Sequence, residues 1–153
     1  MALYFFDSSA LVKRYVHERG SVWVRETTAS PRGHLTHISL LTVAEIASAL
    51  ARRQREGSLS ASERDCLFGA FLVDCARSYL LLRVEEDVIQ HAVVLVNHHP
   101  LRTADAIQLS TALLLAQTLR DAHFDPVIVA SADDRILQAA LREGLQVENP
   151  NIH

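Results

Sequence analysis

The stretch LYFFDSSALVKRYVHERG, residues 3–20, carries the pattern on which the fold depends. Four apolar residues run into an aspartate and two serines, which are favourable helix caps, and a helical stretch then continues to a glycine. This order predicts a short buried strand at residues 3–6 followed at once by a helix. The apolar run is too short for a secretory signal and has no basic leader, so we expect it to belong to the fold.

The rest of the chain repeats this alternation of apolar runs and helical stretches. Strands are predicted at residues 34–38, 79–84, 127–130 and 146–148, and helices at 21–29, 42–57, 60–77, 87–98, 104–120 and 133–144. Strands separated by helices pair in parallel, because each crossover needs a long connection. We therefore predict a three-layer α/β/α sandwich with a central, mainly parallel sheet of four to five short strands. No repeat or linker divides the 153 residues, so one domain over residues 1–153 is expected.

Cysteine usage and hydropathy bear on the cellular compartment. Cys66 and Cys75 lie nine residues apart in one predicted helix, so they point to opposite sides and cannot pair with each other. We interpret both as small buried residues of a reduced protein. The most apolar stretch, residues 106–119, is shorter than a membrane span. The sequence therefore predicts a cytoplasmic protein that does not enter a membrane.

Four acidic residues lie where predicted strands end or predicted helices begin. They are Asp7, Glu45, Asp105 and Asp133. In an open parallel sheet, the carboxyl ends of the strands and the starts of the following helices meet at one edge, where binding sites form. We therefore expect the four carboxylates to share one cleft. The alternative is that each acid only caps its helix, and Thr42 with Glu45 matches a capping box.

A shared cleft of carboxylates has a chemical consequence. Neighbouring negative charges raise each other's pKa values, which is unfavourable unless a cation lies among them. Oxygen ligands without histidine or thiolate suit Mg²⁺ or Mn²⁺, and one or two such ions would fit. Ions of this kind activate a water molecule and stabilise the leaving oxygen during displacement at phosphorus. The acids therefore predict hydrolysis of a phosphodiester.

Four segments resemble the motifs of the PIN-domain family and, more narrowly, of the VapC-like toxins of bacterial toxin–antitoxin pairs. The segments are FFDSSALVKRYVHE, SLLTVAEIASAL, LRTADAIQLSTAL and VIVASADDRILQAA, which together span essentially the whole chain in the family's order. The resemblance implies a catalytic, metal-binding set with two supporting hydroxyls: Asp7, Glu45, Asp105 and Asp133, with Ser9 and Ser131. It also implies an endoribonuclease that depends on Mg²⁺ or Mn²⁺, forms a homodimer and is inhibited by a small antitoxin protein covering the site.

The net charge of −3 is unfavourable for a protein that binds a polyanion. Cations on the four acids would leave the rest of the molecule slightly positive, which weakens this objection. Two pairs of basic residues are candidate RNA contacts, Lys13 with Arg14 and Arg52 with Arg53. A solvated helix end is the alternative for Arg52 and Arg53. The sequence does not place either pair relative to the acids.

Two other functional classes fit the same residues. One is a catalytically silent module with a PIN fold that binds RNA or a protein. The other is a metal-dependent DNA nuclease or phosphatase, because carboxylate–metal chemistry does not itself select the sugar. The apolar positions in residues 88–96 and 107–119 exceed one core-facing stripe, which leaves some of them for a dimer partner or an antitoxin helix.

Overall fold

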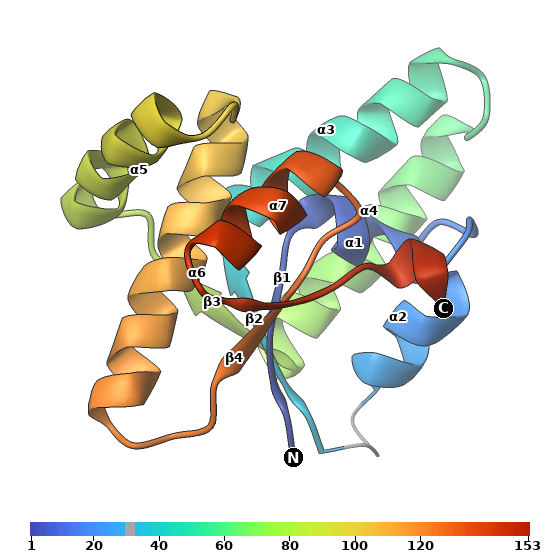
Figure 1. Cartoon of the computed structure of the whole chain (residues 1–153). Helices are drawn as coiled ribbons and strands as arrows, with labels where there is room; N and C mark the ends of the chain where they lie inside the picture. Colours follow the sequence, from blue (N-terminus) through green and yellow to red (C-terminus); the bar gives the residue numbers. More distant parts are fainter. Residues whose placement is uncertain (30–32) are drawn as a thin grey trace.

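The computed structural model describes residues 1–29 and 33–153, whose strands form one parallel sheet (Figure 1). The strands are β1 (Leu3–Phe6), β2 (Leu35–Ser39), β3 (Tyr79–Leu82), β4 (Val127–Ala130) and β5 (Gln146–Glu148). Their spatial order is β3-β2-β1-β4-β5, and every neighbouring pair is parallel. The predicted sheet is confirmed, including the short fifth strand.

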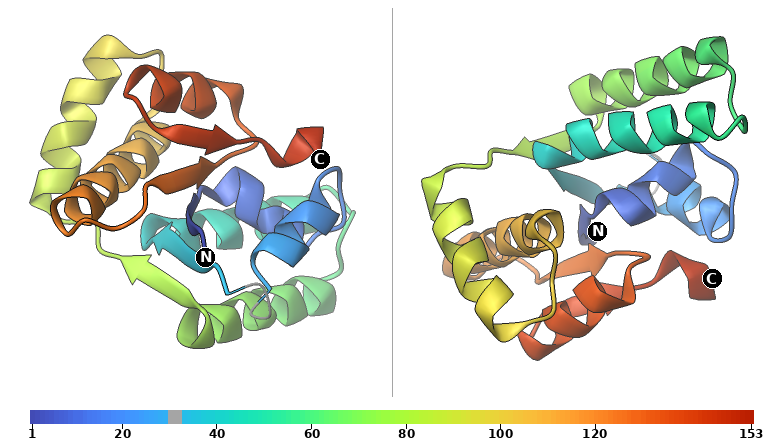
Figure 2. Two further views of the ribbon diagram at one scale, coloured as in Figure 1. Left: turned by 60° about the horizontal axis from the view of Figure 1, so that its bottom comes forward. Right: turned by 90° about the horizontal axis from the view of Figure 1, so that it is seen from above.

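Helices lie on both faces of this sheet, as Figure 2 shows. They are α1 (Ser8–Leu11), α2 (Ser21–Thr27), α3 (Leu41–Arg55), α4 (Ala61–Arg77), α5 (Glu86–His98), α6 (Thr103–Asp121) and α7 (Asp134–Arg142), with the 3₁₀ turns η1 (Val12–Arg14) and η3 (Pro150–Ile152). Among the described residues, no helix is both long and apolar enough to cross a membrane.

Alternate residues of β1 enter two separate hydrophobic cores. Phe5 packs in the core beneath α5, α6 and α7, together with Val127 and Val129 of β4. Phe6 packs in the other core, with residues of α1, α3 and α4. Successive side chains of a strand point to opposite faces, so β1 lies between the two cores. The predicted three-layer α/β/α sandwich is therefore confirmed.

The first predicted helix is shorter than expected. It covers only one turn as α1, continues as η1, and the chain then turns back before Gly20. Polar contacts within this turn explain the break. Lys13 Nζ donates to the carbonyl of Arg19 at 3.0 Å, and the Ser21 hydroxyl donates to the carbonyl of Val16 at 3.1 Å.

Two expectations about burial were wrong. Strand β3 was predicted as a nearly continuous apolar run to residue 84, but it ends at Leu82, and Leu80 and Leu81 are 48% and 37% exposed. The reason is that β3 is the edge strand next to β2. Cys66 is exposed and Cys75 only half-buried, because α4 covers the core with one face; both are free thiols.

The carboxyl-terminal turn packs against the start of α2. The ring of His153 stacks on Trp23 with 4.7 Å between the ring centroids. Gly20 precedes α2 with a φ of 86°, and a Cβ at this position would collide with the backbone carbonyl of Pro150. Glycine is therefore required here both by the backbone conformation and by the close approach of η3.

Candidate active site

The site lies at the carboxyl ends of β1 and β4, where the order in which the chain adds strands to the sheet reverses. The chain adds β2 and β3 on one side of β1, and β4 and β5 on the other. The Asp7 backbone N–H continues the pairing of the two central strands by donating to the carbonyl of Ala130 at 3.0 Å. A crevice between strands at such a switch point is the usual binding position in open α/β sheets.

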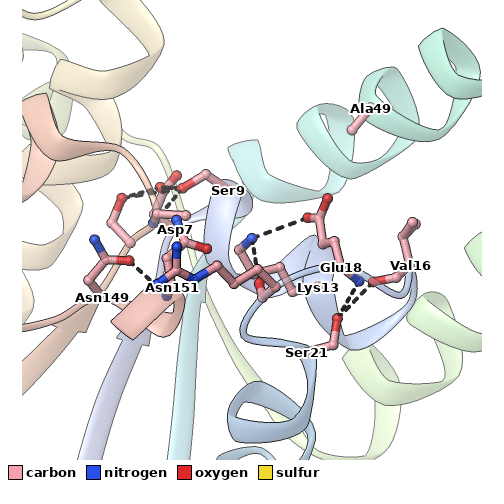
Figure 3. A network of polar contacts seen from close by, with 12 residues as sticks. Asp7, Ser9, Lys13, Val16, Glu18, Ser21, Ala49, Asn149 and Asn151 are labelled. Atoms are coloured by element: carbon pink, nitrogen blue, oxygen red, sulfur yellow. Dashed lines mark hydrogen bonds and ion pairs between the residues drawn. The ribbon is translucent and has the colours of Figure 1, made fainter. Parts of the chain in front are cut away.

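Asp7 is buried and held by hydroxyl groups. One carboxylate oxygen accepts hydrogen bonds from Ser9 Oγ at 2.5 Å and Ser131 Oγ at 2.7 Å, and the other accepts one from Ser8 Oγ at 3.3 Å. Figure 3 shows Ser9 beside Asp7. Ser9 Oγ and Ser131 Oγ also accept backbone N–H groups from Ala132 and Asp133. The two hydroxyls named from the sequence therefore join β1 to the turn after β4.

Burial raises the pKa of the Asp7 carboxyl above its usual range. The serine hydroxyls act in the opposite direction, and the nearby charge of Asp105 adds to the rise. Because Asp7 is only 3% exposed, its negative charge is poorly solvated. A cation beside it would relieve this cost.

Glu45 is held by a residue that the sequence interpretation did not single out. Gln108 of α6 donates from Nε2 to Glu45 Oε2 at 2.5 Å and to Thr42 Oγ1 at 3.0 Å. Gln108 is 1% exposed, and its Oε1 has no hydrogen-bond partner in the described part of the chain. The sequence signal for this role was the position of Gln108, a polar residue within the apolar stretch of the helix predicted at residues 104–120.

The capping box expected of Thr42 and Glu45 is absent. Helix α3 begins at Leu41, and the residue before it already has helical backbone angles, so Thr42 lies inside the helix. Glu45 is therefore free to face Gln108 instead of the helix start. Burial raises the pKa of Glu45, the donors Gln108 and Ser8 lower it, and the charges of Asp7 and Asp105 raise it again.

Asp105 and Asp133 do take capping positions. Asp105 accepts the backbone N–H of Arg102 at 3.2 Å, at the start of α6. Burial raises the pKa of Asp105, and the neighbouring charge of Asp133 contributes to the rise. Asp133 caps α7 by accepting the backbone N–H of Arg135 at 2.8 Å, and the Arg135 guanidinium, 3.0 Å away, holds the pKa of Asp133 below its usual range. Asp134 is exposed in the first turn of α7.

The charges of these acids act on one another. The charge of Asp105 raises the pKa of Asp7, the charges of Asp7 and Asp105 raise that of Glu45, and the charge of Asp133 raises that of Asp105. The side chains are nevertheless turned toward hydroxyl, amide and guanidinium donors. In residues 1–29 and 33–153, no three carboxylate, imidazole or thiol groups are arranged to hold a metal ion. Carboxylate oxygens are ligands that a hard divalent cation prefers, but an ion shared by all four acids requires Asp133 to leave the guanidinium of Arg135.

A pocket of about 380 Å³ adjoins Glu45 and Ser9. We call it the α3 pocket, and its lining consists of Ser8, Ser9, Val12, Glu18, Glu45, Ser48, Ala49, Arg52 and Arg53. Two of the four candidate RNA contacts, Arg52 and Arg53, thus share a pocket with one of the four acids, Glu45.

The other two basic candidates serve the fold. Lys13 is 6% exposed, and its ammonium group lies 3.4 Å from Glu18. Arg14 forms an ion pair with Asp74 at 2.9 Å and lines a separate pocket with Tyr15 and Arg25. Neither side chain is available to a ligand in the α3 pocket.

A sequence model of the PIN domain matches residues 4–141. The chain belongs to the PIN-domain family. No curated protein matches the sequence. Among solved structures, this PIN domain is similar to VapBC2 from Rickettsia felis bound to a DNA fragment from its promoter, with a TM-score of 0.61, 12% identity and coverage of 96% of this chain and 98% of that one.

Two further solved structures share the fold. One is VapC20 from Mycobacterium tuberculosis, described as a sarcin-ricin loop cleaving toxin, with a TM-score of 0.61, 12% identity and coverage of 90% of this chain and 95% of that one. The other is a toxin–antitoxin complex from Klebsiella pneumoniae, with a TM-score of 0.58, 16% identity and coverage of 96% of this chain and 97% of that one. At these identities the likeness concerns the fold of the PIN domain.

Proposed function

We propose that this PIN domain is an endoribonuclease that depends on Mg²⁺ or Mn²⁺. The observation that supports the proposal is a set of carboxylates, buried at Asp7 and partly buried at Glu45 and Asp105, whose pKa values are raised by burial and by the charge of a neighbouring acid. Raised pKa values at three of the four acids are typical of a site that is completed by positive charge. One or two divalent ions on Asp7, Glu45, Asp105 and Asp133 would supply that charge.

The roles of the side chains follow from their contacts. Hydrogen bonds from Ser9 and Ser131 orient the Asp7 carboxylate, and one from Gln108 orients the Glu45 carboxylate. Both carboxylates are therefore held in position to bind a ligand. Asp7, Glu45, Asp105 and Asp133 would hold a divalent ion, whose chemistry when bound would be the activation of water and the polarisation of phosphate oxygens. Asp133 would have to leave the guanidinium of Arg135 before it could contribute.

The biological role that we propose is that of the toxin in a toxin–antitoxin pair. Structures of toxin–antitoxin proteins share the fold, and their likeness motivates the proposal. Such a role implies a small antitoxin protein over the acidic site, a homodimer and a cytoplasmic location. Helix α5 offers an apolar surface for either protein partner, since Ile89, Val93, Val94 and Val96 are 43–58% exposed.

The test is cleavage of matched single-stranded RNA and DNA oligonucleotides with Mg²⁺, with Mn²⁺ and with EDTA. We expect cleavage of RNA alone, only with metal, and a loss of at least ~100-fold in Asp7→Asn and Asp105→Asn. Asp134→Asn is the matched control, because this neighbouring acid is exposed. Circular dichroism should show that all three variants remain folded.

Three outcomes would contradict the proposal. Undiminished cleavage in EDTA would exclude the metal mechanism. Equal cleavage of the DNA oligonucleotide would identify a nuclease of broader specificity. Binding of RNA without cleavage at any metal concentration would identify a silent binding module.

A further inference from the structure

One face of α3 joins the acidic site to a basic end. Glu45, Ser48, Ala49, Arg52 and Arg53 follow the i, i+3, i+4, i+7, i+8 spacing and all line the α3 pocket. The opposite wall comes from α1 and η1. The helix therefore presents an acid at one end, small side chains in the middle and guanidinium groups at the other end.

The pocket has the size of a small-ligand site. Its volume of about 380 Å³ falls within the range of roughly 300–1,000 Å³ that such sites occupy. Ser48 and Ala49 leave the middle open because neither side chain fills it. Glu45 and Arg52 are separated by seven residues, which is roughly 10 Å along a helix. This leaves room for one nucleoside between the acids and Arg52.

The charges around the pocket favour one phosphate ligand. Glu18 lines the pocket, and its carboxylate lies 3.2 Å from Arg53 and 3.4 Å from Lys13, so its charge is compensated. The Arg53 guanidinium donates hydrogen bonds to the Glu18 carboxylate and to the carbonyl of Ala49. Arg52 is exposed and forms no ion pair within the described residues, so its guanidinium is available.

We propose that the α3 pocket is a nucleotide subsite. It takes the nucleotide adjacent to the cleaved phosphodiester, with the sugar or base over Ser48 and Ala49 and the next phosphate on Arg52. This inference rests on the proposed function, because it places the cleaved bond at the carboxylates. The hydroxyls of Ser8 and Ser48 match the polar edge of a nucleoside better than an apolar peptide side chain.

The experiment measures binding of a fluorescein-labelled eight-nucleotide single-stranded RNA by fluorescence anisotropy between 50 and 200 mM salt. All proteins carry Asp7→Asn, which suppresses cleavage. Arg52→Gln should weaken binding by about 3–10-fold and reduce the salt slope by about 0.7, the loss of one phosphate contact. Ala49→Leu should weaken binding several-fold with the salt slope unchanged, since it fills space without changing charge.

A third variant tests the pairing of Arg53. Glu18→Gln releases this guanidinium from its carboxylate, so it should tighten RNA binding and increase the salt slope. The matched controls are Arg55→Gln, which removes the same charge from an exposed position outside the pocket, and Ala44→Leu, which adds the same bulk to an exposed position of α3. Both should bind RNA within twofold of the parent.

Three results would overturn the subsite: no binding of RNA by the parent, unchanged binding in both Arg52→Gln and Ala49→Leu, or equal weakening by Arg55→Gln and Arg52→Gln. If Ala49→Leu is misfolded by circular dichroism, Ser48→Gln fills the same space from an exposed position. If the variants bind RNA as expected but the unmodified protein, with Asp7 in place, cleaves no RNA, the proposed function is wrong and the subsite stands. If Arg52→Gln and Ala49→Leu, made with Asp7 in place, cleave RNA with metal and with an unchanged KM, the subsite is wrong and the proposed function stands.

Discussion

Asp7 shows how one residue couples the fold to the site. Its carboxylate is almost completely buried, yet the side chains of residues 1–29 and 33–153 offer it hydrogen bonds from hydroxyl groups alone. A hydroxyl compensates a buried negative charge less well than a cation does. The folded protein without metal therefore carries a destabilising charge at the carboxyl end of its central strand.

We expect Asp7→Asn to stabilise the metal-free protein by about 0.5–2 kcal/mol at neutral pH, as often happens when a strained functional group is removed. Because folding raises the pKa of Asp7, the cost of its charge is absent below the unfolded-state value near 3.8 and grows in as the pH rises through the folded-state pKa. Urea unfolding at several pH values checks this. The advantage of the variant should be largest at neutral pH and should vanish toward pH 4; an advantage that stays constant across this range would contradict the assignment.

Under the proposed function, Gln108 is a positioning residue, because it donates a hydrogen bond to Glu45 and would act on catalysis through that carboxylate. Gln108→Leu removes the donor and should raise the Mn²⁺ concentration for half-maximal cleavage by about 10-fold, with kcat at saturating Mn²⁺ changed little. Electron paramagnetic resonance of bound Mn²⁺ measures the same loss without RNA. Gln117→Leu is the control, because Gln117 is exposed on the same helix. Equal Mn²⁺ affinity in the parent and Gln108→Leu would refute this role.

The residue types of the candidate site could be read from the sequence, but their contacts could not. Asp7 and Asp133 follow strands, and this position predicts a sheet-edge cluster whatever else they contact. The alternative of a capping box at Thr42 and Glu45 is excluded because α3 already begins at Leu41, which the pattern does not show. Gln108 was missed because its partners on α3 are more than 60 residues away in the sequence.

Elements were predicted best where the local pattern determines them. The strand at residues 127–130 is confirmed, and the helix predicted at residues 60–77 forms as α4, with Ser60 Oγ accepting the Glu63 N–H at 3.1 Å as its cap. The break after α1 did not, because it depends on Lys13 and Ser21 binding backbone carbonyls of the turn. The exposure of β3 depends on strand order, which is a tertiary property.

The contact between α2 and η3 gives a prediction at the scale of elements. Gly57→Ala should cost about 1 kcal/mol, because Gly57 also has a left-handed backbone, with a φ of 83°, but open space around it. Gly20→Ala should cost about 2–4 kcal/mol, because the new methyl group also meets Pro150. Chemical denaturation of the two variants measures the difference. Equal losses would mean that η3 moves away from α2 without cost.

Strand order belongs to the whole molecule and was beyond the sequence interpretation, which specified parallel pairing but not which strand lies in the centre. The position of β1 between β2 and β4 brings the start of the chain beside its last fifth. Asp7, which directly follows β1, therefore lies next to the carboxyl ends of both β2 and β4. The predicted edge cluster therefore depends on an order that only tertiary packing selects.

A bound divalent ion should stabilise the whole fold. At 100 times its Kd an ion contributes about 2.7 kcal/mol, which corresponds to a rise in Tm of roughly 5–10 °C for a chain of this length. Scanning calorimetry with Mn²⁺ and with EDTA measures the shift. Asp105→Asn should lose most of it while Asp134→Asn keeps it, and an identical shift in all three proteins would place the ion elsewhere.

The pairing of β1 with β4 also sets the order of events during protein synthesis. The hydrogen bond from Ser131 to Asp7 joins residues 124 positions apart. At about 5–20 residues per second, the ribosome needs roughly 6–25 s to add the second partner after the first. Until β4 has left the ribosome, Asp7 and Asp133 cannot come together at the ends of β1 and β4. Under the proposed activity, the nascent chain therefore cannot cut the messenger RNA from which it is being translated.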